Sequence, residues 1–391
     1  MDFDLLPEEQ AFQREVEAFL AAHASPEVMD FQPEQLSQTV DTPAKRAFMR
    51  KLADQGWLGM SWPKEYGGQE KSGIYDFILT ESLSRWGAPQ PGKGVGIVGK
   101  TIIRHGSDTL KQTFLPRIIR GEVEFAIGYS EPQAGSDAAN MQLRAEKVDG
   151  GWKLDGKKIW TTSAHFADWY WVGARTDTSH KHKGITVFLV EMNHPGLTIH
   201  PTHTIGDERT NEVFFDDVFV SDDFVVGEVN KGWTYICEAL DLERFAMMPV
   251  GPLEKKVEAW CEWARSSSCD GEPLRRDPRL RSQIAHHVTE LQVARMLQRR
   301  VISEALKDRV PTVESSQYKL YMNELGQRVA RAALDSMGAA GQLKPGNREA
   351  PLDGRFERSY RYTVVDTVGG GTSEIQKNII ARRGLGLPPS Y

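Results

Sequence analysis

Cysteine is scarce in this chain of 391 residues, and the placing of the few cysteines excludes two common kinds of site. Cys237, Cys261 and Cys269 are odd in number and form no CxxC pair, so they indicate neither a disulfide framework nor a zinc site. A reducing, cytoplasmic location is therefore expected. The ten histidines form no HxxxH or HExxH pattern, so no metal site is predicted, and the adjacent His286 and His287 are interpreted as a solvated pair.

The chain also lacks an excess of positive charge, a basic leader and a long apolar run. Lys and Arg number 48 against 54 Asp and Glu, a net charge of -6, whereas a protein that coats phosphates should be basic. The first residues, Met1 to Glu9, are acidic where a signal or transit peptide needs Lys and Arg. No apolar run approaches the ~18–20 residues that span a bilayer. Neither a nucleic-acid partner nor a membrane is expected.

What the chain does contain is an ordinary globular composition, with 40% apolar and 26% charged residues, arranged in three zones. Helical patterns fill residues 1–120, notably 42–55, 73–86 and 107–119. Residues 121–229 contain β-branched and aromatic runs at 167–175, 184–191, 196–205 and 211–220, after a hairpin that turns at Asp149-Gly150-Gly151. Helical periodicity returns over 230–391, with long helices near 284–301 and 313–337. These patterns predict an N-terminal α-helical domain (1–120), a middle antiparallel β domain (121–229) and a C-terminal α-helical domain (230–391).

Three short segments combine glycine, hydroxyl and aromatic residues in a way that suits ligand binding. They are Tyr129 to Asp137, Trp160 to Ser163, and Gly369 to Gln376. Glycine and small polar residues expose backbone N–H groups, and a helix that starts after three glycines offers free N–H groups to an anion. The residues alone leave simpler interpretations open: a polar connection, a core tryptophan, and a loop before a helix capped by Thr372 or Ser373.

Glu243 interrupts an apolar stripe predicted on one helix over residues 233–250. The stripe consists of Ile236, Ala239, Leu240, Ala246, Met247 and Val250. A carboxylate that faces a core finds a partner or has a raised pKa, as a general base requires. The adjacent Arg244 points away and can pair with Asp241. The alternative is a glutamate that is salt-bridged at a helix or subunit interface.

The order and spacing of these segments resemble the acyl-CoA dehydrogenase family. The resemblance rests on Tyr129 to Asp137, Asp155 to Thr162 and Gly371 to Gln376, with Trp62 to Gly68 and Leu240 to Arg244 in agreement. It extends over nearly the whole chain. It implies an α+β fold that consists of a helical domain, a β domain and a four-helix bundle.

The resemblance further implies that FAD is the cofactor and that an acyl-CoA thioester is the substrate. The family removes a proton from the α-carbon and a hydride from the β-carbon, which leaves a trans-2-enoyl-CoA. Carried over by motif, the cofactor-binding residues are Tyr129, Ser130, Ser136, Trp160, Thr161, Thr162, Gly338, Thr372, Ser373 and Glu374. The substrate-binding residues are Ser136, Asp241, Arg244, Gly370 and Gly371.

Two departures from the common family pattern refine this expectation. Many members carry the catalytic Glu immediately before Gly-Thr-Ser, where this chain has Gly370. The isovaleryl-CoA type instead places its base in a helical motif similar to Leu242-Glu243-Arg244, so the resemblance assigns the base to Glu243. Gly369 and Gly370 leave room for a branched, cyclic or steroid side-chain acyl group, although the loop conformation alone could require glycine.

The second departure concerns assembly. The segment Arg265 to Pro273 lacks the Arg-x-x-Phe-Gly of homotetrameric members, and Asp335 stands where a Gln commonly precedes Gly338-Ala339-Ala340-Gly341. This pattern is similar to bacterial sterol side-chain enzymes in which two unlike subunits form an α2β2 tetramer; a homo-oligomer is the alternative. An electron-transfer flavoprotein is the electron acceptor that the resemblance implies. A catalytically silent subunit and an acyl-CoA oxidase are the alternative functions.

Overall fold

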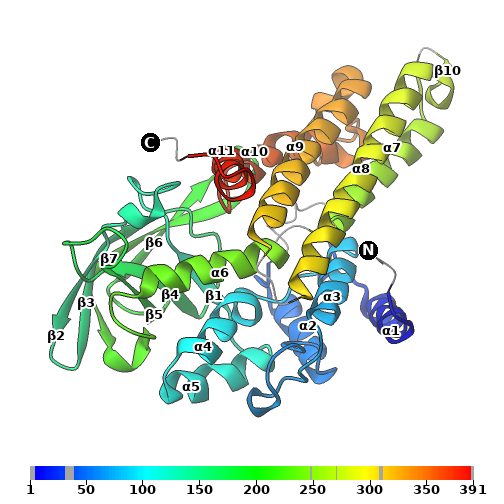
Figure 1. Cartoon of the computed structure of the whole chain (residues 1–391). Coiled ribbons are helices and arrows are strands. Elements are labelled where there is room, and N and C mark those ends of the chain that lie inside the picture. Colours follow the sequence, from blue (N-terminus) through cyan, green and yellow to red (C-terminus); the bar gives the residue numbers. More distant parts are fainter. Residues whose placement is uncertain (1–4, 31–38, 247–248, 270, 308–310, 389–391) are drawn as a thin grey trace.

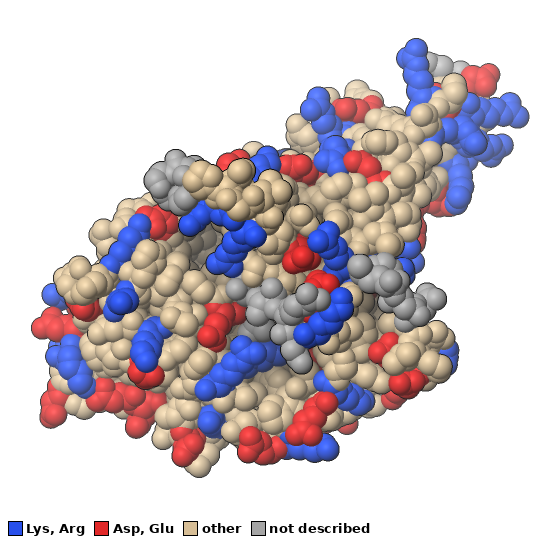
Figure 2. Space-filling model, viewed as in Figure 1, with Lys and Arg blue, Asp and Glu red and all other residues tan. Residues whose placement is uncertain are grey.

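The computed structural model has helices at both ends of the chain and a β domain between them (Figure 1). It describes residues 5–30, 39–246, 249–269, 271–307 and 311–388, and for residues 241–246 it describes the backbone only. No helix in these ranges is long and apolar enough to cross a membrane. On the face in Figure 2, acidic and basic side chains are interspersed, apart from a group of basic side chains at the tip beside β10.

The N-terminal helices form around the apolar positions that the periodicity predicts. Buried Phe12, Val16 and Leu20 lie on one face of α1, and Thr42 caps α2 by accepting a hydrogen bond from the Lys45 N–H at 3.2 Å. A π-helical turn, η3 (Gly94–Val98), directly precedes α4. The helices of this part are α1 (Pro7–His23), α2 (Pro43–Asp54), α3 (Gly73–Arg85), α4 (Gly99–His105) and α5 (Asp108–Ile119).

The β domain is one sheet of eight strands that folds over on itself. Its order is β6-β7-β3-β2-β4-β5-β8, and β1 pairs with β4. The link between β2 and β4 is the single pair Arg144–Arg175. The strands are β1 (Phe125–Gly128), β2 (Arg144–Val148), β3 (Gly151–Lys158), β4 (Trp169–Arg175), β5 (Ile185–Glu191), β6 (Leu197–His203), β7 (Arg209–Ser221) and β8 (Val225–Val226).

Strand β4 is buried on both faces, which explains its continuous apolar sequence. Tyr170 and Val172 pack in a core with Leu154 and Phe215 of the facing strands. On the other side, Trp169 and Trp171 join an apolar cluster with residues of α5, α6 and η3, which we call the helix-side cluster. The helix-side cluster is where the β domain meets the segments that carry the candidate site.

The described C-terminal part contains six α-helices, of which α11 is short. The long helix α6 crosses from the β domain towards the others (Figure 1). Their apolar core includes Trp260, Leu291 and Leu325. The helices are α6 (Gly232–Ala246), α7 (Gly251–Ser266), α8 (Pro278–Ala305), α9 (Thr312–Ser336), α10 (Arg355–Asp366) and α11 (Ser373–Ile379), and a small hairpin, β9 (Ser268–Cys269) with β10 (Glu272–Pro273), precedes α8.

Several local expectations differ from the structure. The β domain is mostly antiparallel as predicted, but β1 pairs with β4 in parallel, because the chain makes the whole β2–β3 hairpin before it returns. The stripe predicted over 233–250 belongs to two helices, since α6 ends at Ala246 and Val250 is the N-cap of α7. His287 is 6% exposed and therefore is not solvated, whereas its neighbour His286 is exposed.

Candidate active site

The loop after β1 is held by a buried ion pair. The ammonium of Lys158, at the end of β3, lies 2.6 Å from Glu131 Oε1, and both side chains are almost completely buried. Glu131 also accepts hydrogen bonds from the backbone N–H groups of Gln142 and Leu143. Burial lowers the pKa of Lys158 to about 8, against the opposing attraction of Glu131. The pair therefore fixes a loop that carries Tyr129, Ser130 and Ser136 to the strand end that precedes Trp160.

Tyr129 follows β1 and packs against the helix-side cluster. Its hydroxyl accepts a hydrogen bond of 2.8 Å from Trp171 Nε1, and its ring is partly buried against the helix-side cluster. Ile236 and Leu240 of α6 belong to the same cluster. Ser130 lies next to the end of β3, because its carbonyl accepts a hydrogen bond of 2.9 Å from the Ile159 N–H. Ser136 is exposed further along this loop.

Trp160 has an unusual backbone and an exposed ring. Its φ is +58°, a left-handed conformation that a bulky residue rarely adopts, and 58% of the residue is exposed. The interpretation of this tryptophan as a core residue is therefore wrong. A strained residue that presents an indole to its surroundings is typical of a binding surface rather than of packing.

The two threonines that follow Trp160 differ in burial and in their hydrogen-bond partners. Thr161 is buried, with its hydroxyl 2.7 Å from the Tyr170 hydroxyl, and its N–H donates to the Asn211 carbonyl at 3.0 Å. The Asn211 side-chain amide donates to the Thr161 carbonyl at 2.8 Å, and its contact with the Thr162 carbonyl is 3.4 Å. Thr162 is only partly buried. Thr161 therefore serves the packing of the β domain, while Thr162 remains within reach of a ligand.

Position 243 lies in the last turn of α6. Helical geometry puts it on the face of Ile236, Ala239 and Leu240, at three to seven residues' spacing. Ile236 and Ala239 are buried and Leu240 is half-buried. The side chains of Glu243, Asp241 and Arg244 lie outside the described residues, so their predicted roles remain predictions. The face that bears position 243 nevertheless continues the face of α6 that lies in the helix-side cluster, against which Tyr129 also packs.

The glycine loop before α11 is held by buried polar side chains from two helices. Lys319 of α9 donates to the Gly371 carbonyl at 2.8 Å, and Gln376 donates to the carbonyls of Gly370 and Gly371 at 3.3 and 3.1 Å. Gly370 and Gly371 have φ values of +64° and +91°, which explains why glycine is required at both positions. The loop therefore turns its carbonyls inward, towards these donors.

Thr372 begins α11 as predicted. Its hydroxyl accepts a hydrogen bond of 3.2 Å from the Ile375 N–H, so Thr372 rather than Ser373 is the N-cap. Ser373 is buried and its N–H donates to the Thr367 carbonyl. Glu374 is exposed, and hydrogen bonds to its own backbone and to Thr372 lower the pKa of its carboxyl.

The β6–β7 turn brings the β domain against the helix that leads to the glycine loop. Arg361 of α10 lies 2.5 Å from Asp207 and donates to the Ile205 carbonyl. Gly206 packs on the backbone of Tyr362, where a Cβ would lie 3.0 Å from the Tyr362 Cα. Figure 1 shows α10 and α11 above the β6 end of the sheet. The three predicted segments thus lie on neighbouring elements, although no described hydrogen bond or ion pair joins Trp160 to the glycine loop.

Gly338 is separate from these segments. It follows the C-terminal end of α9, whereas Lys319, which holds the glycine loop, lies in the first half of that helix. At a rise of about 1.5 Å per residue, the two positions are roughly 28 Å apart along the helix. Gly338 therefore cannot join the glycine loop in one compact site of this chain.

The residues present fit a flat aromatic cofactor such as FAD. Trp160 offers an exposed indole, and Thr162 follows it as a partly buried residue. Tyr129, also partly buried, precedes Ser130, whose carbonyl accepts a hydrogen bond from Ile159, the residue before Trp160. Gln376 is completely buried, and its Oε1 accepts no hydrogen bond from a described residue. A ligand donor could satisfy that oxygen.

Sequence reasoning missed the residues that support the loops. Lys158, Glu131 and Gln376 stood in the quoted motifs without a role. Lys319, and Asn323, which donates a hydrogen bond to the Asp366 carbonyl, were not considered. The alternation of buried Trp152 and Leu154 could have placed Lys158 on the inner face of β3. Nothing local marks Lys319, whose partners lie at least 47 residues away.

One cluster in the described part of the chain has the ligand types of a metal site. His286 Nε2 and His287 Nδ1 lie 3.5 and 2.8 Å from Glu290 Oε2. The other carboxylate oxygen of Glu290 is 2.7 Å from Arg328. The cluster lies on α8, and Arg328 already balances the charge of its only carboxylate.

Comparison with known proteins gives matches along the whole chain. Models of the acyl-CoA dehydrogenase N-terminal, middle and C-terminal domains match residues 6–122, 126–218 and 230–385. Acyl-CoA dehydrogenase FadE26 of Mycobacterium tuberculosis is 31% identical over 396 residues, which cover 99% of both chains. Among solved structures, the Tcur3481-Tcur3483 steroid ACAD and the ChsE4-ChsE5 complex from Mycobacterium tuberculosis each match with a TM-score of 0.90 and 32% identity over 100% of both chains.

Proposed function

The chain belongs to the acyl-CoA dehydrogenase family of FAD-dependent enzymes, and we propose that Glu243 is the base with which it converts an acyl-CoA thioester to the trans-2-enoyl-CoA. FAD, when bound, supplies the acceptor for the hydride of the β-carbon. The protein has to hold the thioester, remove the α-proton and keep water away from the base.

One observation carries the assignment of Glu243. The α6 face of Ile236 and Leu240 packs in the same apolar cluster as Tyr129, and position 243 continues this face by one turn. A carboxylate there would approach the loop that we expect to contact the flavin. Apolar surroundings favour its neutral form and thereby raise its proton affinity towards the value that a base needs.

The other predicted residues divide into ligand contacts and supports. We assign Trp160, Tyr129, Ser130 and Thr162 to the flavin, with Ser136 along the substrate thioester. At Gly370 the backbone is left-handed, a conformation that a glutamate would adopt only with strain, so this chain is not suited to the base position that many family members use. Thr372, Ser373 and Glu374 would lie beside the cofactor at the start of α11.

We propose a bulky acyl group, of the steroid side-chain class, as the substrate. Support comes from the similarity to the Tcur3481-Tcur3483 steroid ACAD over the whole chain. Gly369 agrees with this assignment, because a Cβ there would meet only the Val365 carbonyl, at 3.5 Å. The protein therefore has space at this loop that a larger side chain would remove.

We propose that the active unit contains a second, unlike subunit and that an electron-transfer flavoprotein accepts the electrons. The matched ChsE4-ChsE5 structure is a complex of two named proteins. In this chain, Gly338 lies roughly 28 Å along α9 from the support of the glycine loop, so it could contact only a neighbouring chain's cofactor.

An anaerobic titration tests these assignments. The purified protein, alone and after co-expression with a candidate partner chain, is mixed with linear, branched and steroid side-chain acyl-CoAs while flavin absorbance is followed. We expect bleaching with the bulky thioesters and none with Glu243→Gln, which retains its flavin. Bleaching by Glu243→Gln at the normal rate would exclude Glu243 as the base. Full flavin occupancy and turnover of the chain alone, as a homo-oligomer, would exclude the obligate partner.

A further inference from the structure

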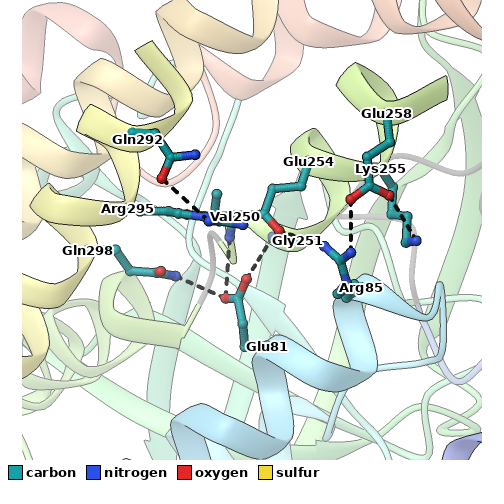
Figure 3. Close-up of polar contacts among 10 residues, drawn as sticks. All are labelled: Glu81, Arg85, Val250, Gly251, Glu254, Lys255, Glu258, Gln292, Arg295 and Gln298. Atoms are coloured by element: carbon teal, nitrogen blue, oxygen red, sulfur yellow. Dashed lines mark hydrogen bonds and ion pairs between the residues drawn. The ribbon is translucent and has the colours of Figure 1, made fainter. Parts of the chain in front are cut away.

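A glutamate of the N-terminal helical domain caps a helix of the C-terminal domain. Glu81 lies on α3 and its carboxylate is enclosed between α3, α7 and α8 (Figure 3). Its Oε1 accepts a hydrogen bond of 2.7 Å from the Gly251 N–H, and its Oε2 accepts hydrogen bonds of 3.3 Å from the Val250 N–H and 3.0 Å from Gln298. Val250 and Gly251 begin α7, so Glu81 satisfies N–H groups that have no partner within that helix.

The start of α7 is packed directly against α3. A Cβ on Gly251 would lie 3.0 Å from the Arg85 Cβ and 3.1 Å from its Cα, so a larger residue would require the two backbones to separate. Arg85, one turn after Glu81, donates to Glu254 at 2.7 Å and to Glu258 at 2.9 Å. Arg295 of α8 pairs with the other oxygen of Glu254. The first turn of α7 is therefore fixed by hydrogen bonds, ion pairs and close backbone contact (Figure 3).

This fixed point lies immediately after the helix that bears position 243. Helix α6 ends at Ala246, and three residues, 247–249, lead to Val250. The carbonyls of the last turn of a helix lack donors from within that helix. The direction of this final turn consequently depends on where the following chain is held.

We propose that Glu81 is a positioning residue for the dehydrogenation. By capping α7 it holds Val250 and Gly251, to which the chain leads after α6, and thereby fixes the place of the base at position 243. This inference rests on the proposed function and adds to it a role for the N-terminal domain. Glu81 acts through the backbone that joins α6 to α7 and touches neither substrate nor cofactor.

The cap requires the ionised form of Glu81. Both carboxylate oxygens face N–H donors, so a proton on either oxygen would meet a donor instead of an acceptor. Burial raises the pKa of Glu81 to about 7, with hydrogen bonds opposing the shift and Glu254 adding to it. The other charged or titratable groups that face this junction are Arg85, Arg295, Glu258 and Tyr318. The cap should therefore weaken as the pH falls below neutrality.

The variant Glu81→Gln tests the proposal, because it keeps the size of the side chain and replaces an acceptor oxygen with a donor. Glu258→Gln is the matched control, since it removes two ion pairs at the same junction, with Arg85 and Lys255, but leaves the α7 cap intact. Three quantities are measured on the FAD-loaded protein at pH 8: hydrogen–deuterium exchange of the peptide over residues 249–254, the rate of flavin reduction at saturating acyl-CoA, and the acyl-CoA concentration for half-saturation.

For Glu81→Gln we expect faster exchange at 249–254 and a flavin reduction rate about tenfold lower, as the loss of one cap predicts. The acyl-CoA concentration for half-saturation should stay within about twofold, and Glu258→Gln should match the parent protein in all three measurements. Faster exchange with an unchanged reduction rate would overturn the positioning role and leave the proposed function intact. Absence of flavin reduction in the parent protein with every thioester would instead overturn the proposed function, and the positioning role with it.

Discussion

The ammonium of Lys158 and the carboxylate of Glu131, 27 residues apart in the chain, meet at 2.6 Å with 0% and 2% of their side chains exposed. This pair joins the end of β3 to the loop after β1, and those two segments carry Trp160 and Tyr129. Two backbone N–H groups also donate to Glu131, so the carboxylate is fully engaged. The candidate cofactor site is therefore built on a buried charge pair.

Replacing Lys158 with Met should destabilise the protein strongly. The variant leaves Glu131 buried without its cation, and the removal of one partner of a buried pair costs about 3–5 kcal/mol. Denaturant unfolding would measure the loss of unfolding free energy. The neighbouring Lys157→Met is the control, because Lys157 is 29% exposed and pairs with Glu212 near the surface; it should cost less than about 1 kcal/mol. Equal losses in the two variants would contradict the special role of the buried pair.

Trp160→Ala should weaken FAD binding without a comparable loss of stability. The side chain is mostly exposed and its φ of +58° is strained, so its removal takes away little packing. Loss of an aromatic stacking partner worth about 1 kcal/mol or more predicts a flavin affinity lower by roughly fivefold to tenfold. Flavin content after dialysis and unfolding of the apoprotein measure the two effects separately. Trp160→Phe should retain most of the affinity, and a large stability loss in Trp160→Ala would instead show that the ring is a packing residue.

Gln376→Ala should loosen the glycine loop. The variant removes the donor to the Gly370 and Gly371 carbonyls, and each such hydrogen bond contributes about 1 kcal/mol. We expect the unfolding free energy to fall by about 1–3 kcal/mol and hydrogen exchange over 369–376 to rise. Lys377→Ala, on the same helix with its side chain 59% exposed, should leave both quantities nearly unchanged. Unaltered exchange in Gln376→Ala would mean that Lys319 holds the loop alone.

Glu124 predicts an unusual dependence of stability on pH. Burial raises the pKa of its carboxyl from 4.5 to about 7, with Arg46 opposing the shift and Asp168 adding to it. The folded state therefore binds a proton more tightly than the unfolded state, so the stability present below pH 4.5 is lost as the pH rises through 7. Relative to Glu124→Gln, the parent protein should lose up to about 3 kcal/mol of unfolding free energy between pH 4.5 and 8. Parallel pH profiles of the two proteins would show that the carboxyl has an ordinary pKa.

Local patterns were enough to predict most of the elements. The α2, α3 and α5 helices were predicted to within one or two residues, because caps and apolar spacing act between close neighbours in the chain. The β2–β3 hairpin was predicted from its glycine turn, and Gly150 has the expected positive φ of 72°. The end of α6 at Ala246 was missed because the apolar spacing over 233–250 was given more weight than Pro249, although a proline shortly after the last periodic residue is a local signal for a helix end.

The ligand-facing residues of the candidate site remain predictions, whereas the side chains that support its loops were missed. Motifs pointed to Tyr129, Trp160 and Thr372, and the structure places each of them on a loop or helix end. The exposure of Trp160 contradicts its interpretation as a core residue, which came from the general tendency of tryptophan to be buried. Whether a given tryptophan is buried depends on what packs over it. Lys319 and Gln376 could not have been assigned, since their acceptors are carbonyls of a loop whose path is set by tertiary packing.

The linear chain thus contained the order of the domains, the glycine loops, the helix caps and the motifs that identify the family. These depend on residue types at short spacing, which keep their meaning without a folded structure. Only the folded structure showed that Lys158 meets Glu131 and that Glu81 caps a helix that begins 170 residues later. A buried charge is tolerable only beside a partner, and the partner's position is a property of packing between domains.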